Sequence, residues 1–495
     1  MANLTTHLFD LIKTLTPSEK KLVMKYAFPY KKGGDSMLRK LFQLVDKQFK
    51  YDEKPLKEKI KNLPTRKLEL WKKIMLVLQT NNNSIEIVKA RRKFDFIHIL
   101  ASKQLFDQIP DMLEELKQWG IAYNQPYYTA IALQYESALQ QSIYDQHAIE
   151  HMSPIRMQIL ETAEQIFLTA QVYEYYMRVA ELDRSNQIIR DGSIIERAKK
   201  LEHDPLHYLP IDRMSLQSLC TYNDAKSTIL FLQRKFIESF KVETISRRAF
   251  QAKKNKTVVD IYNYCTWLTN LMSVHAHLSD YVQWEEDVIA LNDIVIEHFS
   301  DDLIRVSKAN LFTFWFHYRK NKFKDAQHLI KTTEQYYRVN KNLLAEEDVK
   351  FHEWNFVIAF FDMKDYDKSW KYCNEWINKT SADVMPQVQE FMRMFFLFIL
   401  LEKKEWAYLT NRSKQYEKFI GTKDKTLYVF DILVIAFMKK MKSAKNLRGE
   451  QRKLWIWLLE EINKLYDSEN LYTKEVLLVF DFREWINRCK IDLSP

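Results

Sequence analysis

The sequence predicts an all-α protein, most of it an α-α superhelix built from antiparallel helix pairs. Two observations predict this fold class. The first is composition: the 495 residues include 6 Gly and 11 Pro, well below the usual shares of about 7% and 5%. Sheets need many turns that contain these residues, whereas short connections between helices need few. The second is an aromatic-bearing turn that recurs about every 40 residues in the second half of the chain, a period typical of helical repeats.

The first 83 residues are expected to form a separate, basic helical unit. Residues 1–80 contain 18 Lys or Arg and 8 Asp or Glu, and this excess of +10 equals the net charge of the whole chain. A first helix is indicated by an apolar stripe at helical spacing, formed by Leu4, Leu8, Leu11, Ile12 and Leu15.

A second helix is expected to begin at Thr16-Pro17-Ser18-Glu19. Thr16 can cap it, Pro17 suits the first helical position, and Glu19 can reach back to the capping residue. A third helix is indicated by one apolar face, formed by Leu38, Leu41, Phe42, Val45 and Phe49. Further helices could begin at Pro55 and Pro64. The cap- and turn-favouring run Asn81-Asn82-Asn83-Ser84 predicts the boundary between residues 1–83 and a solenoid over residues 84–495.

Five aromatic residues that follow short polar turns mark the repeat. They are Phe236, Tyr281, Phe323, Tyr366 and Trp406, at successive intervals of 45, 42, 43 and 40 residues. A lone helix pair cannot bury its apolar faces, whereas stacked pairs bury a continuous core. We therefore expect each aromatic residue to stand just after the turn of a helix pair and to wedge its two helices together.

The turn Lys-Asn-Lys-Phe323-Lys-Asp-Ala326 is similar to the tetratricopeptide turn, in which a Gly-Asp-Tyr-like tripeptide is followed three residues later by a small residue. Ser369 fills the small position after Tyr366. The segment from Leu11 to Lys20 also resembles the start of a group of uncharacterised bacterial helical-repeat proteins. The tetratricopeptide resemblance implies that the first helix of each pair faces a concave side, where a partner protein or peptide binds.

In that register the concave side would carry a set of polar and aromatic residues. These candidate partner-binding residues are Thr269, Ser273, His277, Lys308, Trp315, Arg319, Trp354 and Asp362. Aromatic residues and arginine are the usual anchors of a binding surface. The alternative is that Trp315 and Trp354 belong to the core between helices.

The basic N-terminal residues suggest a second kind of contact. Lys20, Lys21, Lys25, Arg39, Lys40, Arg66 and Lys67 could form a positive face for a nucleic-acid backbone. The alternative is that these lysines and arginines are spread over several helices and act as ordinary solubilising charges.

One short motif suggests zinc chemistry. His147-Ala-Ile-Glu150-His151 matches the H-x-x-E-H string of inverted zinc peptidases. Met152-Ser153-Pro154 is expected to end that helix at once, and no third ligand can be singled out, so we favour ordinary solvent-facing side chains. The sequence has no glycine-rich phosphate loop and no G-x-S-x-G elbow. We therefore expect no enzymatic activity, no cofactor and no bound metal.

Location and function follow from the remaining features. The four cysteines form no C-x-x-C pair, no signal peptide is recognisable, and the longest uncharged stretch, 261–279, contains many polar residues. We expect a cytoplasmic protein with no membrane span. The predicted function is a non-enzymatic scaffold that binds a partner protein or peptide in the concave groove. The alternative is a nucleic-acid-associated regulator that uses residues 1–83.

Overall fold

The computed structural model describes the chain in thirteen segments. They are residues 4–28, 36–48, 51–81, 86–141, 148–184, 188–190, 192–252, 258–294, 299–320, 322–344, 346–380, 385–445 and 447–492. Every regular element within these segments is a helix. The predicted all-α class is confirmed.

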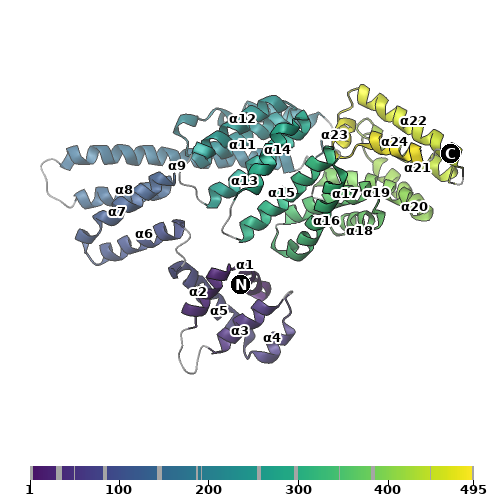
Figure 1. The fold of residues 1–495 in the computed structure, drawn as a ribbon. Helices are drawn as coiled ribbons and strands as arrows, with labels where there is room; N and C mark the ends of the chain where they lie inside the picture. The colour runs from purple at the N-terminus through teal and green to yellow at the C-terminus, as the bar shows by residue number, and fades with distance from the viewer. Residues whose placement is uncertain are drawn as a thin grey trace.

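The N-terminal helices form a compact group beside an elongated body (Figure 1). They are α1 (Leu4–Thr14), α2 (Pro17–Tyr26), α3 (Ser36–Lys47), α4 (Lys54–Lys59) and α5 (Leu63–Asn81). Their apolar faces share one cluster, in which Leu8, Ile12, Leu41 and Ile74 are at most 1% exposed. Phe49 lies outside the described residues.

The predicted helix starts in this group are confirmed. Thr16 accepts a hydrogen bond from the backbone N–H of Glu19 at 3.2 Å, and its own N–H donates to the Glu19 carboxylate at 2.8 Å. Pro55 and Pro64 stand in the first turns of α4 and α5. Helix α5 ends at Asn81, and residues 82–85 lie outside the described segments, so the domain boundary stays a prediction.

The elongated body begins with longer helices and short 3-10 turns. In chain order these are α6 (Glu86–Ser102), η1 (Phe106–Gln108), α7 (Pro110–Ala122), α8 (Pro126–Gln141), α9 (Ala148–Arg184), α10 (Ser193–Glu202), η2 (Pro205–Tyr208) and η3 (Ile211–Arg213). Helices α7 and α8 pack together, α8 packs on α9, and α9 packs on α11 (Leu216–Leu232).

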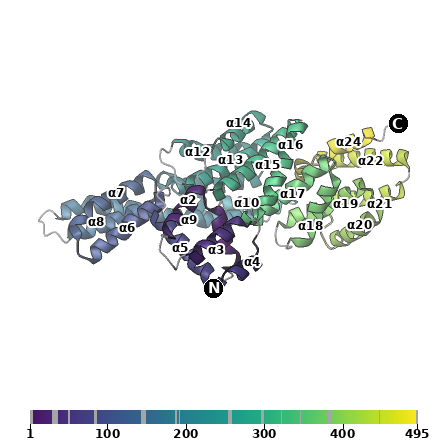
Figure 2. The same cartoon turned by 60° about the horizontal axis from the view of Figure 1, so that its bottom comes forward.

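Successive helix pairs then continue to the far end of the molecule (Figure 2). They are α11 with α12 (Phe236–Ala252), α13 (Val258–Leu278) with α14 (Tyr281–Asn292), α15 (Phe299–Arg319) with α16 (Phe323–Asn340), α17 (Glu346–Asp362) with α18 (Tyr366–Lys379), α19 (Pro386–Glu402) with α20 (Trp406–Ile420), and α21 (Val429–Ser443) with α22 (Arg448–Asp467). The 3-10 turn η4 (Lys341–Leu343) lies between α16 and α17. This chain of packed pairs is the predicted helical-repeat solenoid.

The five marker aromatics occupy equivalent positions. Each is the first residue of the second helix of its pair: α12, α14, α16, α18 and α20. Phe236 packs on Phe231 with ring centres 5.3 Å apart, and Tyr366 packs on Phe361 at 5.4 Å. The aromatic ring thus contacts the last turn of the preceding helix, as predicted for these two pairs.

The turns before these aromatics share one backbone geometry. A residue with a left-handed backbone stands two positions before the aromatic in four of the turns: Arg234, Ser279, Lys364 and Lys404, with φ between 56° and 65°. The next N–H then donates to the carbonyl five residues earlier, as in Lys235 to Leu230 and Glu405 to Leu400, at 2.9 and 3.0 Å. This is the Schellman ending of a helix. Non-glycine residues at this position explain how so many turns coexist with so few glycines.

A buried position three residues after each aromatic brings the paired helices together. Ser239, Trp284, Ala326, Ser369 and Leu409 are at most 2% exposed. Ser239 and Ser227 of α11 exchange hydroxyl-to-carbonyl hydrogen bonds, and Ser369 donates to the carbonyl of Val357 at 2.8 Å.

Replacement of Lys404 by Gly is expected to stabilise the protein by about 0.5–1 kcal/mol, because glycine adopts a left-handed backbone without the Cβ penalty. Lys414→Gly, at an exposed position within α20, should destabilise it by about 1 kcal/mol. Urea denaturation of both variants measures the difference. A loss of stability in both would show that residue 404 does not carry the turn.

One local expectation is wrong. Met152-Ser153-Pro154 does not end a helix, because α9 runs from Ala148 to Arg184 with Pro154 inside it. A proline within a helix removes one backbone hydrogen bond and costs about 3 kcal/mol. Packing of α9 along both α8 and α11 compensates for that loss. His147 and the side chains of Glu150 and His151 lie outside the described residues, so the zinc motif is untested.

The C-terminal helices turn back onto the solenoid. After α22, helix α23 (Leu471–Val479) lies toward the middle of the body, and helix α24 (Phe482–Asp492) then runs back along α22 toward the C-terminal end. Leu471 packs on the cluster of α9, α10 and α11, while Phe480 and Phe482 join the large core of α15 to α22. Arg319 of α15 donates to the carbonyl of Leu478 at 3.0 Å. Helix α23 therefore lies against the first helices of the central pairs.

Among the helices that the structure describes, none has an apolar stretch long enough to cross a membrane.

Candidate functional site

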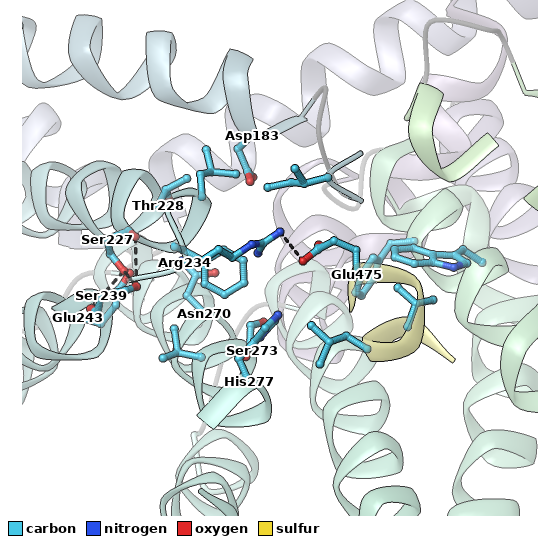
Figure 3. A pocket seen from close by; sticks show the side chains of 18 of the residues that line it. Asp183, Ser227, Thr228, Arg234, Ser239, Glu243, Asn270, Ser273, His277 and Glu475 are labelled. Carbon is cyan, nitrogen blue, oxygen red and sulfur yellow. Dashed lines mark hydrogen bonds and ion pairs between the residues drawn. The ribbon is translucent and has the colours of Figure 1, made fainter. Parts of the chain in front are cut away.

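A cavity of about 370 Å³ lies between the central helix pairs and the returning helix α23 (Figure 3). Its walls come from first helices of the pairs, namely α11, α13, α15 and α17, together with the ends of α9 and α12 and one side of α23. This is the side of the solenoid that the repeat register predicts to be concave. The volume lies at the lower end of the range of about 300–1,000 Å³ usual for small-ligand pockets.

Two arginines form the cationic part of the wall. Arg234 holds its place through the left-handed turn between α11 and α12, and its guanidinium pairs with Glu475 of α23 at 2.5 Å (Figure 3). Arg319 donates to the carbonyls of Ala276 and Leu478, both at 3.0 Å. Burial lowers the pKa of Arg319. Both arginines therefore attach α23 to the central pairs.

Carboxyl groups form the opposite part of the wall. Glu243 of α12 is 1% exposed and lines the cavity, as does Asp183 of α9. Asp224 of α11 lies one layer behind, where it accepts a hydrogen bond from the side-chain amide of Asn270 at 2.7 Å.

The carboxyl groups are poorly solvated and close to one another. Burial, together with the charge of Asp183, raises the pKa of Asp224 to about 7. Burial also raises the pKa of Glu243 well above its usual value, and the charge of Asp224 adds to this. Asn270 and Ser227 face the Glu243 carboxyl and oppose the rise only in part. Burial therefore favours the protonated forms of Glu243 and Asp224.

A histidine forms a neutral part of the wall. The Nδ1 of His277 donates to the carbonyl of Ser273 at 2.8 Å, and the ring stacks on Phe236 with centres 4.6 Å apart. Burial lowers the pKa of His277 to about 4, so the ring carries no charge at pH 7. His277 thus lines the cavity, whereas His275, two residues earlier on α13, is fully buried.

Four of the eight predicted partner-binding residues line this cavity. They are Ser273, His277, Arg319 and Trp354.

The other four predicted residues do not line the cavity, for identifiable reasons. Thr269 is buried and donates to the carbonyl of Thr266. The indole of Trp315 donates to Asn355 at 2.7 Å, within the core between helices. Asp362 forms an ion pair with Arg488 of α24, and Lys308 is half-buried outside the cavity wall. The core alternative therefore holds for Trp315.

Three charged residues of the cavity wall, Arg234, Glu243 and Glu475, were not predicted from the sequence. Arg234 lies in a recognised turn, but its left-handed backbone gives no signal in the sequence. Glu243 stands on the second helix of its pair, which the repeat register assigns away from the concave side. Glu475 reaches the site because α23 folds back across more than 200 residues of chain, and no local pattern predicts that return.

The basic N-terminal residues form a weaker set than predicted. Lys67 is 3% exposed and pairs with Glu53 at 2.6 Å, so it cannot belong to an exposed positive face. Lys20 pairs with Asp46 and Arg66 with Glu69, both at 2.7 Å. Exposed side chains at Lys21, Lys25 and Lys40 remain. Three of the predicted basic side chains therefore form ion pairs within the group of N-terminal helices.

Within the described segments no group of three His, Cys, Asp or Glu side chains is placed to hold a metal ion.

Comparison with known proteins finds a distant structural similarity and no similarity in sequence. No protein-family model matches the chain, and no curated protein is similar to it in sequence. Among solved structures, the crystal structure of the apo form of RapI is similar over 82% of this chain and 97% of its own, at 7% sequence identity and a TM-score of 0.36.

Proposed function

We propose that this protein is a non-enzymatic interaction protein that receives a short segment of a partner on the concave side of its solenoid. The proposal rests on one observation: first helices of four consecutive pairs converge on a cavity that has polar and aromatic walls. Solenoids use such concave surfaces for binding.

The position of α23 limits what can bind. Arg319 and Arg234 hold this helix across the groove through Leu478 and Glu475. A whole partner helix cannot occupy the same place while α23 is there. The remaining space suits a few side chains or a chain terminus of the partner.

Site-specific photocrosslinking in the host cell tests the proposal. A benzoylphenylalanine at Phe351, which lines the cavity, should crosslink to a partner protein. The same residue at Tyr408, which is 56% exposed on the second helix of its pair, should not. Crosslinking from residue 408 but not from residue 351 would contradict the proposal.

A second variant shows whether the cavity itself is needed. Thr228→Trp places an indole in the cavity wall and should abolish the crosslink from residue 351. Ile245→Trp, at a position on α12 that is 50% exposed, is the matched control and should leave the crosslink intact. An unchanged crosslink in Thr228→Trp would place the partner elsewhere.

The nucleic-acid alternative receives less support. In the predicted basic surface of residues 1–83, Lys67 is buried, and Lys20 and Arg66 form ion pairs with acidic residues. Because phosphate-backbone affinity depends on the number of available cations, fewer contacts remain than the sequence suggested.

A further inference from the structure

A second cavity lies between α18, α19 and α20, which pack side by side (Figure 1). Its volume is about 230 Å³, below the range of about 300–1,000 Å³ usual for small-ligand pockets, so it suits one compact group. Among the described residues that line it, the charged ones are Arg393 and Arg412. None of its lining residues also lines the concave cavity, so this second site does not depend on the proposed function.

The two arginines reach this cavity through crossed contacts with aromatic rings. The guanidinium of Arg393 on α19 lies over the ring of Phe419 on α20, 5.2 Å from its centre. The guanidinium of Arg412 on α20 lies over the ring of Phe396 on α19, at 5.7 Å. A guanidinium contacts a ring with its flat face and donates hydrogen bonds along its edge. The rings therefore position both groups while their N–H edges stay available to an acceptor.

No carboxylate within the described part of the chain pairs with either arginine. Arg412 donates to the amide oxygen of Gln415 at 3.1 Å, and Arg393 contacts the ring described above. Glu390, one turn before Arg393 on α19, pairs instead with Arg190 at 3.2 Å. Both cavity arginines are half-buried. Two positive charges thus meet at one concave site without an acidic partner.

We propose that this cavity binds a phosphate monoester group. Such a group carries a charge of about −1.5 to −2 at pH 7 and three strong acceptor oxygens, which matches two guanidinium groups. Each guanidinium can donate two parallel hydrogen bonds to such oxygens. The side-chain amide of Gln415 adds a donor, and Ile377 and Phe396 offer an apolar surface to the carbon atom that carries the phosphate.

Calorimetric titration of the full-length protein with ethyl phosphate, at pH 7 and low ionic strength, is the direct test. We expect saturable binding to one site. Ethanesulfonate has a similar tetrahedral head with a single negative charge, and it should bind much more weakly because it leaves one arginine without compensation.

Replacement of the arginines locates the site. Arg393→Gln should weaken the binding of ethyl phosphate more than about tenfold, because it removes a charged donor group. Arg393→Lys keeps the charge but not the paired donors, and its affinity should be intermediate. Lys414→Gln removes the same charge at an exposed position on α20 and should bind as the original protein does. If Arg393→Gln does not fold, Arg412→Gln should show the same loss of affinity.

A further variant excludes the concave cavity as the place of binding. Thr228→Trp fills the concave cavity and should leave the affinity for ethyl phosphate unchanged. A loss in Thr228→Trp would place the anion beside Arg234 and Arg319 and overturn the inference. Equal binding of ethanesulfonate, no saturable binding of ethyl phosphate, or undiminished binding in the folded arginine variants would each overturn it as well.

Two further probes separate the possible sources of the phosphate. The methylamide of Nα-acetyl-O-phosphoserine stands for a phosphorylated side chain of a protein, and the same compound without phosphate is its uncharged control. Tighter binding of the phosphoserine compound than of ethyl phosphate assigns the site to a phosphorylated side chain, and the reverse order assigns it to a free phosphate compound. Equal binding of the phosphorylated and unphosphorylated serine compounds would overturn the inference.

Discussion

Replacement of Arg190 by Ala is expected to lower the free energy of unfolding by about 3–5 kcal/mol. Arg190 is 9% exposed and pairs with Asp431 at 2.6 Å and with Glu390 at 3.2 Å. Its guanidinium also lies over the rings of Tyr472 and Tyr428, at 3.6 and 3.9 Å from their centres. This one side chain connects the segment after α9 with α19, α21 and α23. Its loss leaves the fully buried carboxyl of Asp431 without its cation.

Two controls identify the cause of that loss. Adding Asp431→Asn to Arg190→Ala should recover part of the stability, because the buried charge is then removed as well. Lys464→Ala breaks an exposed pair with Glu461 and should cost less than about 0.5 kcal/mol. Urea denaturation followed by circular dichroism measures all of these. A cost for Arg190→Ala no larger than that of Lys464→Ala would contradict the role assigned to Arg190.

Replacement of Asp224 by Asn is expected to stabilise the ligand-free protein at neutral pH. Folding raises the pKa of Asp224 from 3.8 to about 7, so the unfolded chain releases a proton more readily than the folded one. Between these two values the contribution of Asp224 to stability falls as the pH rises, by about 1.4 kcal/mol per pH unit. Well below pH 3.8 the group is protonated in both states and contributes nothing.

The gain from Asp224→Asn should therefore depend on pH. At pH 8 we expect a gain of roughly 2–4 kcal/mol, and at pH 4 a gain near zero. Glu238→Gln, exposed on α12, should change stability little at either pH. Thermal denaturation at pH 4, 6 and 8 checks this. A destabilised Asp224→Asn at pH 8 would show that the carboxylate is stabilised by a cation that the cavity wall does not contain.

The repeat was predictable because its signal is local and recurs. Five second helices begin with an aromatic residue at nearly equal spacing, and four of them follow turns of one left-handed geometry. The capping box at Thr16 was predictable for the same reason, since all its atoms lie within four residues. The wrong end assigned at Pro154 shows the limit of a local rule, because packing along α8 and α11 outweighs one lost hydrogen bond.

The candidate site was only half predictable. The register of the helical repeat alone places Ser273, His277 and Arg319 on the concave side, because they lie on one face of the first helices α13 and α15. It cannot place Glu475, because the return of α23 depends on contacts between segments far apart in the chain. It also cannot tell that Lys67 is buried, since that depends on Glu53 and Tyr51 in the segment just before α4.

Amide hydrogen exchange of the full-length protein, with and without the partner protein recovered through the crosslink from residue 351, tests most directly whether the covered concave cavity is the binding site. Slower exchange is predicted in the segments that enclose it, Phe236–Ala252 of α12 and Leu471–Val479 of α23, and no change in Leu4–Asn81. Protection confined to residues 4–81, or protection that leaves both enclosing segments unchanged, would contradict the account.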